Sequence, residues 1–293
     1  MAINDKSIWT PLKIIQWAVP YLNQKGIKNS KLDVEILISF ALKIDRLGVY
    51  LQFDRPLDAT ELSLIRELLK RRSRHEPIQY ITGCREFFGL SFNVSSGVLI
   101  PRPETEQLVE LGIEFLGRVP ESQRIVLDLG TGSGCIAISI AKNIHCYVWA
   151  VDVSQTALSV AQANAEKLGI TSSIEWRRGD WFSALNPSDP DKFSLIVCNP
   201  PYISLSERDE IASEVKNYEP PEALFAGTDG LSAYVSLEKI LKEKLSIKGT
   251  VLLEIEANRC DKILKIFKDF QYKKTIFKDL QGLPRVLKLE NIV

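Results

Sequence analysis

The sequence predicts an α/β protein in which a mostly parallel sheet with a C-terminal antiparallel hairpin follows a small all-helical domain and a β-hairpin linker. Residues 1–80 carry only helical patterns, a short period-two segment comes next, and from residue 123 strand and helix patterns alternate. The 293 residues also exceed the length at which a single core usually stops growing. We therefore expect a helical domain over residues 1–80, a linker over 81–100 and an α/β domain over 101–293.

Three helical patterns make up the first 80 residues. The first ends before Gly26, the second follows Ser30, and the third begins at Asp58-Ala-Thr-Glu61, which is a helix-capping pattern. The apolar positions at helical spacing are Leu12, Ile15, Trp17, Val19 and Leu22 in the first, Leu32, Ile36, Leu37, Phe40 and Ile44 in the second, and Leu62, Ile65, Leu68 and Leu69 in the third. These segments predict a small helical bundle.

The linker and the start of the second domain carry two further signals. Phe88, Leu90, Phe92 and Val94 alternate with polar residues, which indicates a strand or hairpin. The two prolines of Ile100-Pro-Arg-Pro-Glu-Thr-Glu106 then predict a rigid extended segment before a helix that carries Leu108, Leu111 and Phe115.

Alternating strands and helices fill the rest of the chain. Strands are expected at residues 124–129, 147–152, 173–177, 193–198 and 249–255, and helices at 133–142, 154–168 and 229–245. Repeated strand–helix units predict a parallel sheet with helices on both faces. Residues 271–278 and 285–290 are too close together for an intervening helix, so they predict a terminal antiparallel hairpin.

Composition narrows the function classes. Lys and Arg number 37 and Asp and Glu number 37, but residues 1–80 hold 13 basic and 9 acidic side chains, against 24 and 28 in the remainder. A chain with zero net charge is not held on nucleic acid by bulk positive charge, so no stable nucleic-acid partner is expected. Five scattered cysteines without a C-x-x-C pair and only two histidines predict neither a disulfide framework nor a metal site. The absence of an apolar run of ~18 residues or a secretory leader predicts a cytoplasmic protein without a membrane partner.

A glycine-rich turn follows the first strand of the α/β domain. Gly130, Thr131, Gly132, Ser133 and Gly134 stand where the carboxyl ends of parallel strands bind ligands. The third glycine comes one residue too early for the G-x-G-x-x-G pattern of dinucleotide sites. Asp128 adds a negative charge, which we expect to favour a cationic or zwitterionic ligand over pyrophosphate. A turn without a ligand is the alternative.

Two acidic positions complete a candidate cofactor site. Asp152 ends the next strand, where such an acid binds ribose hydroxyls, although it could instead cap the following helix. Asp180, Trp181 and Phe182 follow the third strand and could hold an adenine by a polar contact and an aromatic face, although an aromatic pair there is more often part of the core. Together the positions describe an adenosine with a positive centre near a carboxylate, which is S-adenosyl-L-methionine.

Asn199-Pro-Pro-Tyr202, directly after the fourth strand, is the candidate chemical site. Pro200 and Pro201 hold the backbone extended, while the Asn199 side-chain oxygen and the Pro200 carbonyl can accept hydrogen bonds from a planar NH2 group. Tyr202 can stack on that plane. The arrangement selects an amide or an exocyclic amine, and positioning alone can contribute ~7–11 kcal/mol to its methylation without a base or metal. A structural role, in which the prolines only end a strand, is the alternative.

These motifs resemble Rossmann-like S-adenosylmethionine-dependent amino-methyltransferases. Four segments resemble one family among them, the release factor N5-glutamine methyltransferases of the PrmC or HemK type: Leu32-Asp-Val-Glu-Ile-Leu37, Glu76-Pro-Ile-Gln-Tyr-Ile-Thr-Gly83, Glu86-Phe-Phe-Gly-Leu90 and Leu99-Ile-Pro-Arg-Pro-Glu-Thr-Glu106. The resemblance implies methylation of the glutamine amide in the Gly-Gly-Gln motif of peptide chain release factors, with the helical domain choosing the substrate.

The same resemblance implies roles for individual residues. The five loop residues from Gly130 to Gly134 would contact the cofactor together with Asp152, Trp181 and Asn199. The glutamine would be held by Asn199, Pro200, Pro201 and Tyr202, of which Asn199, Pro200 and Tyr202 would be catalytic. One departure stands out, because Glu256 and Arg259 occupy positions where the family usually has glycine and glutamine.

Three other functions stay open at this point. The basic run Lys70-Arg-Arg-Ser-Arg-His75 could contact phosphates, as in a methyltransferase of adenine N6 or guanine N2 in nucleic acid, although a helix end or a solvated face explains it as well. The altered Glu256 and Arg259 could mark a cofactor-binding regulator without turnover. An NAD enzyme is disfavoured by the glycine spacing.

Overall fold

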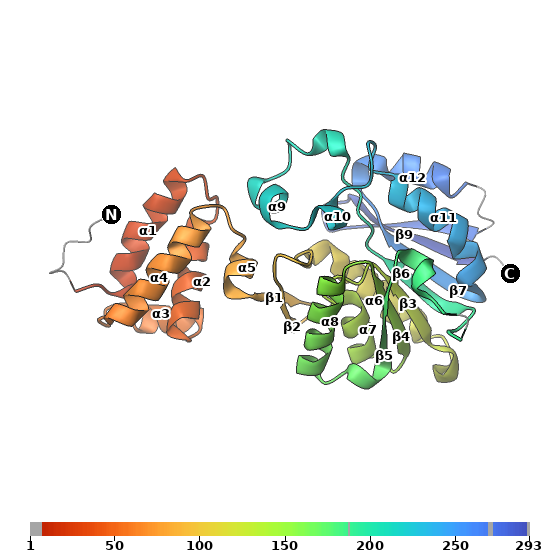
Figure 1. Cartoon of the computed structure of the whole chain (residues 1–293), viewed down its shortest axis with the longest axis horizontal. Helices are drawn as coiled ribbons and strands as arrows, with labels where there is room; N and C mark the ends of the chain where they lie inside the picture. The colour runs from red at the N-terminus through yellow and green to blue at the C-terminus, as the bar shows by residue number, and fades with distance from the viewer. Residues whose placement is uncertain (1–7, 187, 269–271, 292–293) are drawn as a thin grey trace. The chain divides into compact units, whose positions relative to one another are not determined.

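The structure, a computed structural model, describes residues 8–186, 188–268 and 272–291 (Figure 1). It contains two compact units. The helical unit comprises Met1–Gly83 and Ala212–Tyr218, and the sheet unit comprises Cys84–Ile211 and Glu219–Val293. The segment Ala212–Tyr218 therefore belongs to the helical unit although it lies far along the chain. The domain roles and boundaries expected from the sequence stay predictions.

The described part of the helical unit contains six α-helices. They are α1 (Pro11–Gln24), α2 (Ser30–Leu42), α3 (Arg46–Leu51), α4 (Ala59–Arg72), α5 (Ile78–Thr82) and α9 (Ser213–Tyr218). The predicted capping box is present: Asp58 accepts from the Glu61 backbone, and Glu61 accepts from the Asp58 backbone. The short helices α3, α5 and α9 were not predicted, because six residues or fewer cannot show a helical period.

The buried face of α2 differs from the sequence prediction. Leu32 and Phe40, expected on the apolar face, are 40% and 44% exposed. The residues of α2 that enter the core are Val34, Leu37, Ile38 and Ala41. Asp33 and Glu35 are buried beside them because each is paired with arginine, Asp33 with Arg72 and Glu35 with Arg46. Buried ion pairs break the apolar stripe that a sequence reading relies on.

The sheet unit contains a seven-stranded sheet in the order β5-β4-β3-β6-β7-β9-β8. Its strands are β3 (Ile125–Leu129), β4 (Tyr147–Asp152), β5 (Ile174–Arg178), β6 (Phe193–Cys198), β7 (Leu245–Glu254), β8 (Tyr272–Lys278) and β9 (Pro284–Asn291). Strands β5, β4, β3, β6 and β7 pair in parallel, and β9 pairs antiparallel with both β7 and β8. The structure confirms the mostly parallel sheet with a terminal hairpin. Residue 271, the expected start of that hairpin, lies outside the described residues.

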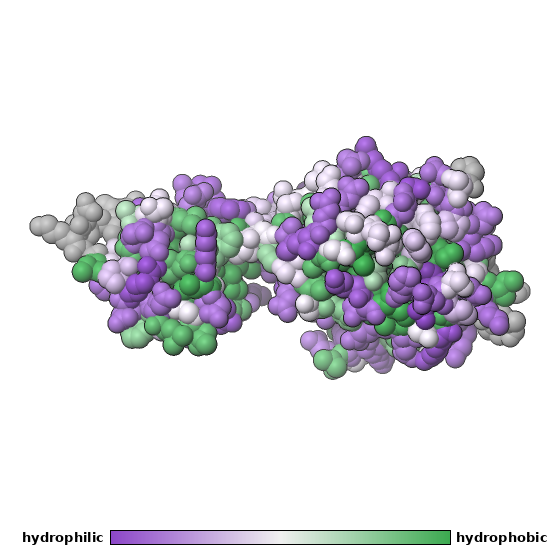
Figure 2. All heavy atoms as spheres, turned by 90° about the horizontal axis from the view of Figure 1, so that it is seen from below, coloured by the Kyte–Doolittle hydropathy of each residue, from purple (hydrophilic) through white to green (hydrophobic). Residues whose placement is uncertain are grey.

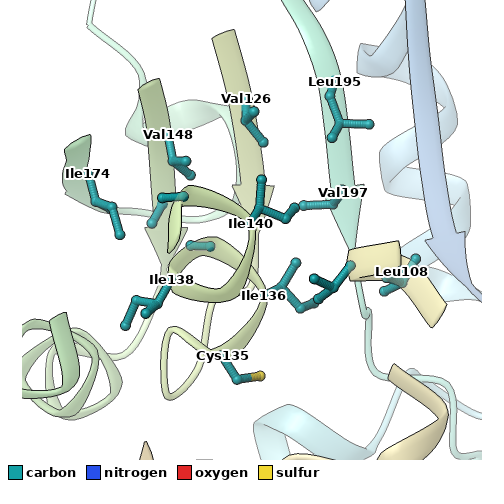
Figure 3. Packing of buried hydrophobic residues seen from close by; sticks show 14 of the residues in the cluster. Leu108, Val126, Cys135, Ile136, Ile138, Ile140, Val148, Ile174, Leu195 and Val197 are labelled. Atoms are coloured by element: carbon teal, nitrogen blue, oxygen red, sulfur yellow. The ribbon is translucent and has the colours of Figure 1, made fainter. Parts of the chain in front are cut away.

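Helices cover both faces of this sheet (Figure 1). Helices α6 (Glu106–Leu116), α7 (Cys135–Asn143) and α8 (Gln155–Leu168) contribute to one apolar cluster. On that face, side chains of α7 such as Ile136 and Ile140 meet Val126 and Val197 of the strands (Figure 3). Helices α11 (Ser232–Lys244) and α12 (Cys260–Ile266) contribute to the second cluster. The remaining helix, α10, spans Pro221–Leu224.

The predicted period-two segment forms a hairpin of β1 (Cys84–Phe87) and β2 (Leu90–Asn93). Its turn is at Phe88 and Gly89, both with positive φ, so Phe88 lies in the turn and not in a strand. Phe87 and Phe92 enter the first apolar cluster of the sheet unit. The expected strand at residues 249–255 begins earlier, at Leu245, because α11 ends at Lys244.

Exposed apolar side chains are concentrated on the helical unit, and Figure 2 shows apolar surface between its hydrophilic side chains. Large apolar side chains that are more than a third exposed there are Ile8, Leu12, Leu32, Phe40, Leu47, Tyr50, Leu51, Phe53 and Leu64. Within the described part of the chain, no helix is both long and apolar enough to cross a membrane.

Candidate active site

A cavity of about 320 Å³ lies in the sheet unit beside the carboxyl ends of β3, β4 and β6. Seven residues predicted from the sequence line it: Gly130, Gly132, Asp152, Asp180, Trp181, Asn199 and Pro201. Its size suits a nucleoside-sized ligand. The sheet therefore brings the glycine loop, the acid of the second strand and the Asn-Pro-Pro-Tyr segment to one place.

The glycine loop turns through three residues in the left-handed region. Gly130, Gly132 and Gly134 have φ of 73°, 57° and 79°. A Cβ built on Gly130 or Gly132 would meet no atom within 4 Å, so both face open space in the cavity wall. At Gly134 a Cβ would lie 2.9 Å from Ile138 Cδ1, which explains the third glycine by packing. The first two glycines thus leave open backbone in the cavity wall, and we call this surface the glycine cradle.

Asp128 is held below this loop and does not line the cavity. Its Oδ2 accepts hydrogen bonds from Thr131 Oγ1 at 2.7 Å and from the Ala137 backbone at 3.2 Å. Burial raises the pKa of Asp128 to about 7. The carboxyl group is therefore enclosed and shapes the loop, and the expected preference for a cationic or zwitterionic ligand stays a prediction.

The polar residues of the loop also point inward. The Thr131 hydroxyl is committed to Asp128, and Thr131 and Ser133 are only 3% and 2% exposed. Neither they nor Gly134 belong to the described lining of the cavity. Side-chain contacts of these residues with a cofactor stay predictions.

Asp152 joins the loop to the next strand. Its Oδ2 accepts from the Gly132 backbone at 2.8 Å and its Oδ1 accepts from the Ser154 backbone at 2.9 Å. The N-cap of α8 is Ser154, so Asp152 supports the helix entry without being the cap. Burial raises the pKa of Asp152, and the charge of Glu222 raises it further. Each carboxylate oxygen keeps a second lone pair for a ligand hydroxyl in the cavity.

The aromatic pair after β5 is divided between two environments. Trp181 lines the cavity and has a positive φ of 49°. Phe182 is 7% exposed and belongs to the second apolar cluster. The alternative that these aromatics are core residues is therefore correct for Phe182, while Trp181 both packs against that cluster and lines the cavity.

The Asn-Pro-Pro-Tyr segment leaves the end of β6 at the cavity edge. Asn199 and Pro201 line the cavity, Pro200 is buried and Tyr202 is half-buried. Burial raises the pKa of the Tyr202 hydroxyl, so Tyr202 stays neutral. The Asn199 Nδ2 donates to Thr105 Oγ1 at 3.2 Å. That bond directs the NH2 end of the amide toward Thr105 and leaves the oxygen as the acceptor.

Some residues of the site were missed from the sequence. Cavity-lining residues that no motif predicted include Gly97, Val98, Pro220, Glu222, Phe225 and Ser232. Thr105 lies inside the segment Leu99–Glu106, which carries the family resemblance. That resemblance was the sequence signal that could have identified Thr105 as a site residue. Residues 220–226 carry no periodic pattern, so only the fold could bring them to the site.

Glu256 and Arg259, which depart from the family pattern, take part in one ion-pair cluster. The Arg259 guanidinium donates to Glu256 and Glu207, and its Nε donates to the Asp229 backbone at 2.9 Å. Glu207 lies five residues after Tyr202. Glu256 and Arg259 thus hold the loop that follows the Asn-Pro-Pro-Tyr segment. They do not alter the residues of that segment.

Two family descriptions match the sequence, "PrmC N-terminal domain" over residues 13–83 and "Methyltransferase small domain" over residues 109–217. A release factor glutamine methyltransferase of Geobacter sulfurreducens is 41% identical over 261 residues, covering 89% of each chain. A protein of the same name from Rhodopirellula baltica is 35% identical over 293 residues, covering 98% of each. The hMettl16 catalytic domain in complex with MAT2A 3′UTR hairpin 6 superposes with a TM-score of 0.53 at 18% identity, covering 78% of this chain and 83% of that one, and shows the fold alone.

Proposed function

This chain belongs to the release factor glutamine methyltransferase family, and from that premise we propose that it methylates the side-chain amide nitrogen (N5) of the glutamine in the Gly-Gly-Gln motif of peptide chain release factors. The methyl donor in this proposal is S-adenosyl-L-methionine. The observation that carries the proposal is the meeting of Asn199 with the glycine cradle and Asp152 around one cavity. A release factor substrate also places the enzyme in the cytoplasm, where translation takes place.

The residues of the cavity fit the proposed cofactor. The open glycines Gly130 and Gly132 let a ligand approach the backbone, and Asp152 offers acceptors for ribose hydroxyls. Trp181 offers an aromatic surface for the adenine. Asn199 lines the same cavity as this cradle. When bound, S-adenosyl-L-methionine supplies an electrophilic methyl group.

The Asn-Pro-Pro-Tyr segment fits a planar amide as methyl acceptor. The Asn199 side-chain oxygen and the Pro200 carbonyl accept from its two N–H groups, and Tyr202 stacks on its plane. Two acceptors on these hydrogens concentrate the lone pair of the nitrogen toward the methyl group. Orientation of this kind lowers the barrier of such a step by ~7–11 kcal/mol. As the N–C bond forms, the S–C bond of the donor breaks and S-adenosyl-L-homocysteine leaves, and the methylated amide releases its extra proton to water.

The ion pairs formed by the basic run at residues 70–75 favour a protein substrate over nucleic acid. Arg72 is 6% exposed and pairs with Asp33 at 2.7 Å and with Glu214 at 2.9 Å. Arg71 donates through two nitrogens to Glu76. Two of its four basic residues are thus engaged within the helical unit. The exposed apolar side chains of that unit suit a protein partner better than a phosphate backbone.

The experiment is methyl transfer from labelled S-adenosyl-L-methionine to three acceptors in parallel. We expect label on a bacterial release factor, and none on DNA or ribosomal RNA at equal concentration. The matched control is the release factor with its Gly-Gly-Gln glutamine changed to glutamate, which should stay unlabelled. Label on a nucleic acid but not on release factor would reject the proposal, and absence of transfer to every acceptor would favour a regulator without turnover.

A further inference from the structure

Asn199 is the first member of a buried hydrogen-bond chain that the proposed reaction does not yet use. The Asn199 Nδ2 donates to Thr105 Oγ1 at 3.2 Å, and Thr105 Oγ1 donates to Glu254 Oε2 at 2.6 Å. Thr105 is 2% exposed and Glu254 is 3% exposed, so water does not compete for these groups. These two hydrogen bonds therefore connect the cavity with the interior of the sheet unit.

The fold explains why these three residues meet. Asn199 and Glu254 each lie one position beyond Cys198 and Leu253, which are register partners of the parallel strands β6 and β7. Thr105 ends the turn Pro103–Thr105 and directly precedes α6. Its hydroxyl makes no capping bond to that helix, so helix capping does not account for it.

Glu254 determines which group donates in each of these two hydrogen bonds. A threonine hydroxyl has one hydrogen, and Thr105 gives it to the Glu254 carboxyl, which leaves only lone pairs facing Asn199. The Asn199 amide must therefore present its NH2 end to Thr105. Burial raises the pKa of Glu254 to about 7, against the lowering effect of the hydrogen bond from Thr105. Even a protonated carboxyl group keeps a carbonyl oxygen that can accept from Thr105.

We propose that Thr105 and Glu254 are positioning residues, which hold the Asn199 side chain with its carboxamide oxygen toward the methyl acceptor. This inference rests on the proposed function, in which that oxygen accepts from the substrate amide. A reversed Asn199 would put its own NH2 group against the NH2 group of the substrate, where two donors face each other without an acceptor. Neither Thr105 nor Glu254 lines the cavity, so both act through Asn199.

The test compares Thr105→Val with Thr105→Ser in the full chain. Valine keeps the shape and lacks the hydroxyl, whereas serine keeps the hydroxyl and lacks the methyl group. We expect Thr105→Val to lower kcat for release factor methylation about 10- to 100-fold, because a misplaced reactive group typically has such an effect. Thr105→Ser should restore most of this loss. The dissociation constant of S-adenosyl-L-methionine should stay within about twofold in both variants.

A second pair of variants separates the acceptor role of Glu254 from its charge. Glu254→Gln keeps an oxygen that accepts from Thr105, while Glu254→Leu removes it and frees the Thr105 hydroxyl to donate to Asn199. We expect a clearly larger fall in kcat for Glu254→Leu than for Glu254→Gln. Equal losses in the two variants would show that the charge matters and would overturn the positioning role.

A control variant accounts for the general loss of a buried hydroxyl. Ser194→Ala removes a buried hydroxyl at the opposite end of β6, where Ser194 Oγ donates to the Ile125 carbonyl at 2.9 Å. This variant should keep its kcat even where its stability falls. Wild-type methylation with an unchanged kcat in Thr105→Val, or an equal loss in Thr105→Val and Thr105→Ser, would overturn the inference and leave the proposed function standing. An inactive wild type would instead reject the proposed function.

Discussion

The backbone N–H of Gly132 donates a hydrogen bond of 2.8 Å to Oδ2 of Asp152. This bond fixes the glycine loop after β3 to the acid at the end of β4, so the cradle and its carboxylate form one preorganised surface. The Gly130 and Thr131 backbones strengthen the same link, because both donate to the Val151 carbonyl at 2.9 Å. A ligand that binds here meets a backbone already held in shape.

Replacement of Asp152 tests the cofactor side of the site. Asp152→Ala removes the acceptors for the ribose and releases Gly132, so the binding of S-adenosyl-L-methionine should weaken by about 1.5–3 kcal/mol, the usual range for hydrogen bonds to charged groups. Asp152→Asn keeps one acceptor oxygen and should lose less. Isothermal titration calorimetry measures both. An unchanged dissociation constant in Asp152→Ala would remove this residue from cofactor binding.

Replacement of Asn199 tests the substrate side. Asn199→Ala should leave most of the cofactor affinity in place and nearly abolish methyl transfer, because the substrate amide loses its side-chain acceptor. The matched control is Asn143→Ala, at an exposed asparagine that ends α7. Single-turnover kinetics with saturating cofactor measures the effect. Normal turnover in Asn199→Ala would exclude the residue from the mechanism.

Gly230 tests the support of Tyr202. A Cβ at Gly230 would lie 2.3 Å from the Tyr202 carbonyl oxygen and 2.7 Å from Arg259 Nε, so Gly230→Ala must displace the Asn-Pro-Pro-Tyr loop. We expect a loss of kcat with little change in cofactor affinity.

Gly282→Ala is the control for Gly230→Ala. Gly282 has a similar φ of 82°, and a Cβ there would meet nothing within 4 Å, so this variant carries the backbone strain without the clash. Equal kcat values in the two variants would show that Tyr202 does not depend on Gly230.

The buried carboxyl group of Asp128 predicts how the free energy of unfolding depends on pH. Burial raises its pKa to about 7 in the folded state, against an ordinary value of 3.8 in the unfolded chain. The folded protein then retains a proton that the unfolded chain releases, so this contribution to stability is complete below the unfolded pKa and is lost as pH rises toward 7. Asp128→Asn cannot ionise. Its free energy of unfolding should rise relative to wild type across this window, by at most about 1.4 kcal/mol per pH unit.

Denaturant unfolding between about pH 5 and pH 7.5 measures this difference. The control is Asp189→Asn, because the hydrogen bond from Arg177 lowers the pKa of Asp189 to about 2. The stabilising contribution of Asp189 is lost only as pH falls toward that value, so its variant should differ from wild type by a constant amount over the tested window. Parallel curves for wild type and Asp128→Asn would contradict the assignment to Asp128.

Sequence patterns predicted the elements that depend on residues close together in the sequence. β4 and β6 have the bounds expected from their apolar runs, and the capping box at Asp58 is present. The buried face of α2 could not be predicted, because Asp33 and Glu35 enter the core only when their arginine partners come from elsewhere in the chain.

In the candidate site, too, features set by neighbouring residues could be predicted, and contacts between distant residues could not. Its glycines and the Asn-Pro-Pro-Tyr segment follow strands directly, so their place at the sheet edge could be predicted. Thr105 and Glu254 are separated by 149 positions in the sequence, and only the fold brings their side chains together. The burial of Asp128 could not be predicted, because its position in the sequence does not tell whether its carboxylate faces a ligand or the interior.

The most direct measurement is mass spectrometry of a purified bacterial release factor after incubation with this protein and S-adenosyl-L-methionine. We expect a gain of about 14 Da, the difference between a methyl group and a hydrogen, on the peptide that contains Gly-Gly-Gln, with fragment ions that place it on the glutamine. The gain should be absent when Asn199→Ala replaces the wild-type enzyme. An unmodified Gly-Gly-Gln peptide, or a methyl group on another residue, would contradict the account.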